Sequence, residues 1–296
     1  MCGIVGLFVR DPSLEPEFGS LMSAMLTTMT DRGPDSAGFA VYTHGDQGTL
    51  KVTVRIDDPE ERDRHAGALS DLTGEKSSVT IRNTHVVVAT PVDQVSIVQD
   101  YINNTDGLEL VSIGEHMEIY KDVGLPSDVS DRFGLSKMSG THGIGHTRMA
   151  TESAVTTAGA HPFTTSTDQC LVHNGSLSNH HDLRRRLAKD GVLLRTENDS
   201  EAAAGYISSR LMKGDTLDAA LEKSLDALDG FFTFVVGTAS GFGVLRDPIA
   251  CKPAVMAETD QYVAFGSEYR ALAELPGIGK ARVWEPEPAT VYFWER

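Results

Sequence analysis

The first residues of the chain place a thiol at the start of an apolar, strand-like run, Met1-Cys2-Gly3-Ile4-Val5-Gly6. If Met1 is removed, Cys2 carries both a thiol and a free α-amino group. An unperturbed α-amine has a pKa of about 7.7 to 8.0, so part of it is neutral near pH 7 and can act as a general base. One residue would then supply both parts of an activated nucleophile. The alternative is a buried small apolar residue, and this hexapeptide does not decide between the two.

Two other segments place polar side chains and glycines where predicted strands end. Glycine and histidine are dense in Gly143-Ile144-Gly145-His146-Thr147-Arg148, and an apolar stretch leads into His173-Asn174-Gly175. Functional sites tend to lie on such segments, because a rigid scaffold positions them. Taken alone, Asn174-Gly175 equally predicts a hairpin turn, for which this dipeptide is the strongest short signal.

The elements that must position these residues alternate between helices and strands. An apolar stripe at helical spacing over residues 18–29 predicts a helix, which ends at Gly33-Pro34. Further helices are predicted over residues 178–191, 199–212 and 215–228, and strands over residues 37–42, 231–237, 242–245, 262–265 and 290–294. Because strands cluster at both ends of the chain, we expect a two-sheet sandwich flanked by helices.

Residues 50–139 have a different pattern within the domain, which is expected to span residues 2–296. The predicted strands are residues 50–56, 79–90, 108–113 and 116–120, and the predicted helices are residues 59–72 and 93–102. This alternation predicts a small α/β insertion. Its polar residues form no recognisable constellation, so no chemistry is predicted there.

Composition excludes several classes of function. The chain has 296 residues and a formal net charge of -16, which argues against a nucleic-acid binder because phosphate contacts need clustered Lys and Arg. It contains neither a long apolar run nor a basic leader, so we expect a cytoplasmic protein without membrane contact. Cys2, Cys170 and Cys251 are isolated in the sequence and lack zinc-site spacing, so no metal is expected.

Several short motifs occur in a set order along the chain. They are Met1-Cys2-Gly3-Ile4-Val5-Gly6, Arg32-Gly33-Pro34-Asp35-Ser36-Ala37-Gly38, Gly145-His146-Thr147-Arg148-Met149-Ala150-Thr151, Ala160-His161-Pro162-Phe163, His173-Asn174-Gly175, Asp199-Ser200-Glu201 and Arg246-Asp247-Pro248. Together they resemble the class II glutamine amidotransferases, which are N-terminal-nucleophile hydrolases. The resemblance covers most of the chain outside the insertion. It implies an α+β fold, a four-layer αββα sandwich with a small α/β insertion.

That resemblance assigns roles to three catalytic residues. It implies that Cys2 attacks the side-chain amide of glutamine, forming a thioester and releasing ammonia. The donors to the tetrahedral intermediate would be the Asn174 side-chain amide and the Gly175 backbone N–H. Glycine suits this position because a backbone donor must approach the substrate without a Cβ in the way.

The family pattern also assigns substrate-binding residues. Arg148 matches the arginine that binds the α-carboxylate of glutamine through its planar fork, the alternative being a surface salt bridge. Asp199 matches the carboxylate that receives the α-ammonium group, the alternative being a helix cap. Thr151 and His161 fall in matching motifs and are expected to line the pocket. Arg32 is expected to order the loop over Cys2.

Members of this family normally deliver ammonia to a second active site. Little sequence follows the last predicted strands, so we expect a partner to carry the synthase chemistry. The chain resembles the stand-alone amidotransferase subunit of split glutamate-synthase-like enzymes such as N-methylglutamate synthase. That resemblance implies a flavin-bearing synthase subunit, with FMN on it, a β-helical subunit, and no cofactor in this chain. The product, glutamate or N-methylglutamate, stays open.

Two alternatives come from other classes. One is a regulatory or scaffolding subunit that keeps the fold and binds glutamine or glutamate with little hydrolysis of its own. The other is an amidase acting on peptides or acylated amines. The pair Arg148 and Asp199 disfavours the amidase, because it would select a free amino acid.

Overall fold

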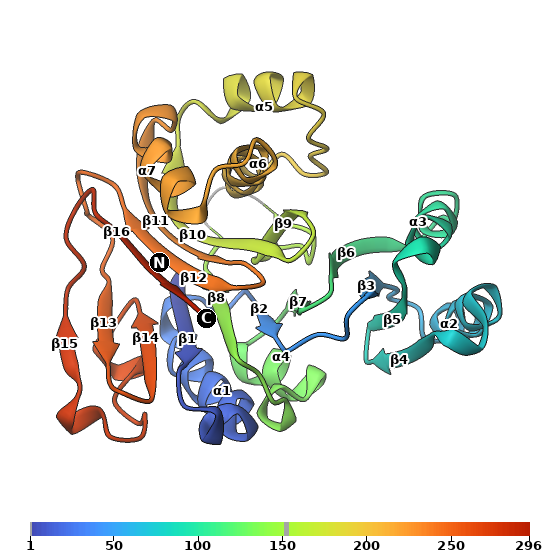
Figure 1. Ribbon diagram of the computed structural model, residues 1–296, viewed down its shortest axis with the longest axis horizontal. Helices are drawn as coiled ribbons and strands as arrows, with labels where there is room; N and C mark the ends of the chain where they lie inside the picture. Colours follow the sequence, from blue (N-terminus) through green and yellow to red (C-terminus); the bar gives the residue numbers. More distant parts are fainter. Residues whose placement is uncertain (1, 151–153) are drawn as a thin grey trace.

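The chain folds around two stacked sheets, seen in the computed structural model, which describes residues 2–150 and 154–296 (Figure 1). In spatial order, the seven-stranded sheet contains β15 (Arg282–Trp284), β13 (Val255–Glu258), β14 (Tyr262–Gly266), β1 (Gly3–Val9), β8 (His142–Arg148), β2 (Ser36–Tyr42) and β7 (Met117–Val123). The five-stranded sheet contains β16 (Val291–Glu295), β12 (Gly241–Arg246), β11 (Gly230–Gly237), β10 (Gln169–Leu177) and β9 (Phe163–Ser166). The paired strands run antiparallel.

Both faces of the central strand β1 are buried. Ile4 and Phe8 contribute to the apolar layer between the two sheets, whereas Val5 and Leu7 contribute to the layer under the helices. Successive side chains of a strand point to opposite faces, so one strand of apolar residues can serve both layers. This arrangement explains why the N-terminal run lacks polar residues.

Helices cover the outer face of each sheet. α1 (Phe18–Thr28) and α4 (Pro126–Phe133) pack on the seven-stranded sheet, and α5 (His180–Lys189), α6 (Asp199–Met212) and α7 (Leu217–Ala227) pack on the five-stranded sheet. The order helix, sheet, sheet, helix confirms the predicted four-layer αββα sandwich. Among the helices formed by the described residues, none has both the length and the apolar character needed to cross a membrane.

A third sheet occupies the insertion, at the right of Figure 1. Its spatial order is β4 (Ser78–Arg82), β5 (His85–Pro91), β3 (Thr49–Arg55) and β6 (Glu109–Gly114), with α2 (Pro59–Thr73) and α3 (Val95–Asn103) packed on one face. The single strand predicted over residues 79–90 is wrong. Asn83 adopts a φ of 53°, which reverses the chain into the hairpin β4–β5. The boundaries of the insertion as a separate domain stay a prediction.

The insertion leaves and re-enters the seven-stranded sheet at neighbouring points. β2 and β7 pair over their full lengths, from Ser36 opposite Val123 to Tyr42 opposite Met117. Directly beyond this pair, the Thr43 N–H donates to the carbonyl of His116 at 2.9 Å. Residues 44–115 therefore form one long excursion whose two ends are hydrogen-bonded to each other.

Several histidines are buried in an uncharged state. Burial lowers the pKa of His85, His142 and His146 to about 3 each. His85 is fully buried between the insertion sheet and α4, where its ring lies 4.7 Å from the ring of Phe133. Because the unfolded chain would protonate these rings near pH 6.5, folding is opposed by protonation at acidic pH.

We therefore predict that His85→Leu weakens the acid sensitivity of folding. Because the folded-state pKa of His85 is lowered, the contribution of His85 to the free energy of unfolding keeps its full value above pH 6.5. It falls progressively as the pH drops toward 3, where protonation favours the unfolded chain. Removing this group should reduce the loss of unfolding free energy between pH 6.5 and 5 by about 2 kcal/mol. Urea unfolding at several pH values measures this slope. Identical slopes for variant and wild type would contradict the prediction.

Candidate active site

Cys2 lies at the start of β1, where the ends of three strands of the seven-stranded sheet meet. Next to it, Gly3 pairs with Thr147 of β8. On the other side, the Ile4 N–H donates to the hydroxyl of Ser267, and the Ser267 N–H donates to the carbonyl of Ile4, both at 2.9 Å. The Cys2 Sγ is 3.9 Å from the carbonyl oxygen of Met149 and is half-buried. The backbone on both sides therefore fixes where the thiol lies.

The carbonyl oxygen of Cys2 accepts hydrogen bonds from two side chains. Arg32 Nε, which follows α1, donates at 2.9 Å, and Asn174 Nδ2, from β10 of the other sheet, donates at 3.0 Å. The structure therefore brings three of the predicted residues together, although they are far apart in the sequence. Arg32 lies beside Cys2, and its role in ordering the loop over Cys2 stays a prediction.

Glu268 is a residue that the sequence analysis missed. Its Oε1 accepts from Arg32 Nη1 at 2.7 Å, and its Oε2 accepts from Arg270 Nε at 2.7 Å. The hydrogen bond from Arg32 and the nearby Arg270 hold the pKa of Glu268 below its usual value. Glu268 thus orients the guanidinium that holds Cys2. No local pattern marks it, because its position depends on the pairing of β14 with β1.

Asn174 and Gly175 lie inside β10, opposite Thr233 and Phe232 of β11, so the hairpin-turn alternative is wrong. Gly175 has a φ of 155°, and a Cβ at this position would lie 2.0 Å from the carbonyl oxygen of Phe231. Only glycine fits such a conformation and such a close approach. The strand therefore distorts at the point where the resemblance assigns a backbone donor.

Asp199 connects α6 to β10. Its Oδ2 accepts from the backbone N–H of Leu177 at 2.9 Å, and its Oδ1 lies 4.0 Å from His173 Nδ1. The helix cap is Asn198 instead, whose side chain accepts from the N–H of Ser200 at 2.9 Å. Asp199 is therefore the first residue of the helix and not its cap, and its side chain faces the strand that carries Asn174.

Arg148 ends β8, one position beyond the Thr147–Gly3 pair. Arg148 is buried, with 7% exposure, and its Nη1 donates to the carbonyl of Ala154 at 3.3 Å. Its own carbonyl accepts from the N–H of Asp35 at 3.0 Å. The guanidinium therefore contacts the loop of residues 154–162. Thr151 lies outside the described residues, so its predicted role stays a prediction.

His161 belongs to a buried group of histidines, together with His146 and His173. The rings of His161 and His146 stack with centroids 4.0 Å apart, and His146 Nε2 donates to the carbonyl of His173 at 3.1 Å. Burial lowers the pKa of all three, so they are neutral at pH 7. Only His161 was singled out as a pocket residue from the sequence. Across residues 2–150 and 154–296, no cluster of His, Cys, Asp or Glu has a metal-site arrangement.

The chain is similar to known glutamine amidotransferases. The model of the glutamine amidotransferase domain matches residues 146–274. A glutamine amidotransferase-like protein of Rhizobium meliloti (strain 1021) is 58% identical over 100% of this chain and 98% of its own. A putative glutamine amidotransferase of Methanothermobacter thermautotrophicus is 33% identical over 99% of both chains.

Solved structures support the same fold. The glutamine phosphoribosylpyrophosphate amidotransferase of B. subtilis superposes with a TM-score of 0.63 at 20% identity, covering 99% of this chain and 47% of that chain. This chain thus spans about half the length of that relative. The fold and the relatives together define a glutamine amidotransferase domain. The chain belongs to the class II glutamine amidotransferase family.

We predict that Gly175→Ala destabilises the fold strongly. The new Cβ would meet the Phe231 carbonyl at 2.0 Å in a conformation that non-glycine residues avoid, so the expected loss of stability is about 3 kcal/mol or more. Gly191→Ala is the matched control, because Gly191 also has a positive φ, of 81°, but nothing lies within 4 Å of a Cβ there. Its expected cost is about 1 kcal/mol. Thermal unfolding of both variants measures the difference, and equal losses would contradict the prediction.

Proposed function

We propose that this chain is the glutamine-hydrolysing subunit of a glutamate-synthase-like complex and that Cys2 is its nucleophile. The observation that carries this proposal is the convergence of Arg32 and Asn174 on the Cys2 carbonyl, at the strand end where Arg148 also lies. Removal of Met1 would expose the α-amine beside the thiol.

The proposed reaction is hydrolysis of the glutamine side-chain amide in two steps. The α-amine of Cys2 takes the thiol proton, and the sulfur attacks the amide carbon to give a tetrahedral oxyanion. The Asn174 amide and the Gly175 N–H stabilise this oxyanion. When the C–N bond breaks, the proton passes to the leaving nitrogen, which departs as ammonia. Water then cleaves the thioester, releasing glutamate and restoring the thiol.

Recognition of a free amino acid would depend on two oppositely charged residues. The buried guanidinium of Arg148 can form two parallel hydrogen bonds with the α-carboxylate of glutamine. The carboxylate of Asp199, 23% exposed, is suited to the α-ammonium group. His161 would support the pocket wall through its stacking on His146 rather than by charge.

Delivery of ammonia to a separate chain is the second part of the proposal. The two relatives aligned over 98% and 99% of their own lengths are named for amidotransferase alone, which supports a division of labour between subunits. By this proposal the partners are a flavin-bearing synthase subunit that binds FMN and a β-helical subunit. The assembly would make glutamate or N-methylglutamate.

We predict that Cys2→Ala abolishes glutamine hydrolysis by the processed protein, with a rate loss of at least about a thousandfold. The backbone carbonyl that Arg32 and Asn174 hold is kept, so the fold should be unchanged. Cys251→Ala is the matched control, because Cys251 is exposed and should be dispensable. Ammonia release and intact-mass spectrometry measure activity and loss of Met1. Turnover by Cys2→Ala, or an active enzyme that retains Met1, would refute the assignment.

The complex is tested by purification of the tagged chain from its native source. We expect co-elution of a larger subunit with a flavin absorbance spectrum, and glutamine-dependent formation of glutamate or N-methylglutamate, identified by mass spectrometry. Co-purification of flavin-free partners only would contradict the synthase assignment. A complex that binds glutamine without releasing ammonia would instead favour the regulatory alternative.

A further inference from the structure

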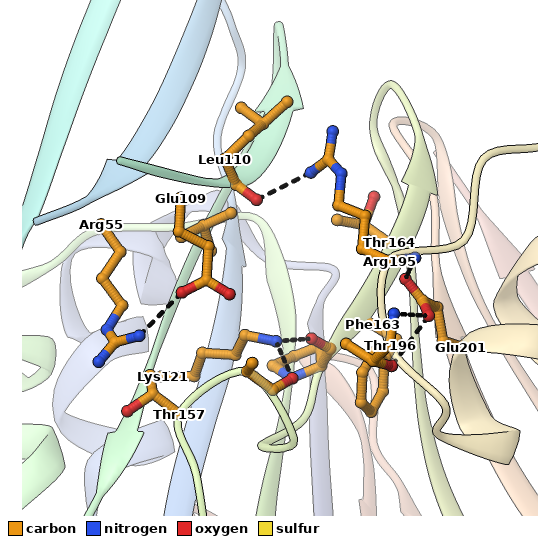
Figure 2. Close-up of a pocket in the computed structure, with 13 residues that line it drawn as sticks. Arg55, Glu109, Leu110, Lys121, Thr157, Phe163, Thr164, Arg195, Thr196 and Glu201 are labelled. Atoms are coloured by element: carbon orange, nitrogen blue, oxygen red, sulfur yellow. Dashed lines mark hydrogen bonds and ion pairs between the residues drawn. The ribbon is translucent and has the colours of Figure 1, made fainter. Parts of the chain in front are cut away.

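Lys121 lies where three parts of the molecule meet. It belongs to β7, an edge strand of the seven-stranded sheet, and lines a pocket (Figure 2). The other walls come from strands β3 and β6 of the insertion, from the loop of residues 154–162 with the start of β9, and from α6 with the segment that precedes it. The charged residues of these walls are Arg55, Glu109, Arg195 and Glu201.

The Lys121 ammonium donates to main-chain carbonyls of the loop. Its Nζ lies 2.8 Å from the oxygen of Ala160 and 3.4 Å from the oxygens of Ala158 and Pro162. Figure 2 shows the side chain extending toward Phe163, whose ring centre is 4.8 Å from Nζ. An ammonium has three donors, so one side chain can serve three carbonyls. Burial lowers the pKa of Lys121 to about 8, which leaves it largely charged at pH 7.

The carboxylates near Lys121 are engaged by other groups. Glu109 accepts from Arg55 Nη1 at 2.8 Å, and Glu201 accepts from the backbone N–H of Arg195 at 2.8 Å. Both contacts are visible as dashed lines in Figure 2. The hydrogen bonds of Lys121 therefore go to the loop, and its charge strengthens them.

Strands β2 and β7 hold the same loop at two further points. Thr157 Oγ1 donates to Asp122 Oδ1 at 2.8 Å, one residue after Lys121. The His161 carbonyl lies against β2, where a Cβ at Gly38 would be only 2.1 Å from its oxygen. The loop is thus seated on the sheet edge with its carbonyls directed at β7.

The loop in turn contacts Arg148. Arg148 Nη1 donates to the carbonyl of Ala154 at 3.3 Å, and Gly159 approaches so closely that a Cβ there would lie 3.4 Å from Nη1. His161, near the end of the loop, stacks on His146, which precedes Arg148 by two residues in β8. Displacement of the loop would therefore displace the guanidinium.

We propose that Lys121 is a positioning residue for glutamine binding: its ammonium fixes the loop of residues 154–162, and the loop fixes the guanidinium of Arg148. This inference rests on the proposed function, in which Arg148 binds the α-carboxylate of glutamine. A misaligned Arg148 guanidinium would bind the α-carboxylate of glutamine less tightly but would leave the reacting atoms unchanged. Loss of the ammonium should therefore raise KM while kcat changes little.

The test compares Lys121→Met with Lys51→Met. Lys121→Met keeps a long apolar side chain and removes the positive charge. Lys51 is the matched control, because its side chain is 17% exposed and its Nζ contacts Glu118 and Thr43 at 3.0 Å on another part of the sheet. In Lys121→Met we expect KM for glutamine to rise about tenfold or more, with kcat within about twofold. In Lys51→Met both constants should stay as in the wild type.

Amide hydrogen exchange without glutamine supplies a second measurement. Exchange in residues 154–162 should become faster in Lys121→Met and stay unchanged in Lys51→Met. If Lys121→Met does not fold, Lys121→Gln takes its place under the same criteria. A folded variant with wild-type KM and wild-type exchange would overturn the proposal. If the wild type hydrolyses no glutamine while the exchange difference persists, the proposed function fails and the hold of Lys121 on the loop stands.

Discussion

The carbonyl oxygen of Cys2 is the acceptor on which the geometry of the site depends. It receives one hydrogen bond from Arg32, next to the helix of the outer layer, and one from Asn174, in the opposite sheet. A backbone carbonyl moves only if the chain moves, so these two bonds fix the residue that carries the thiol. Glu268 fixes the first donor, and β10, which pairs with β11, fixes the second. The stacking of the two sheets is thereby coupled to the position of one sulfur atom.

The segments around Cys2 differ in how tightly they are packed. The strands that carry Cys2, Arg148 and Asn174 are buried on both faces, and side chains there cannot shift without creating cavities. In the loop of residues 154–162 the first three residues are exposed, and the rest is held by polar contacts to Lys121 and Asp122 and by the stacking of His161 on His146. Buried strands therefore carry Cys2, Arg148 and Asn174, while the loop that contacts Arg148 is partly exposed.

The sequence predicted those parts that have a local pattern. The apolar stripe of α1 and the buried run of β1 follow from periodicity, and the ordered motifs identified the family and its fold. Asn174-Gly175 shows where local signals fail, because the same dipeptide makes a turn in isolation and a distorted strand here. Glu268 and Lys121 carry no signal at all. Glu268 contacts Arg32, which is 236 positions away, and Lys121 contacts the loop of residues 154–162. Only the folded chain shows these contacts.

The long excursion between β2 and β7 begins and ends at paired residues, which bears on how long this connection must be. Since Tyr42 and Met117 are already opposite each other, a short connection could join these strands without altering their register. The pairing of β2 with β7 therefore sets no fixed length for the segment that connects them.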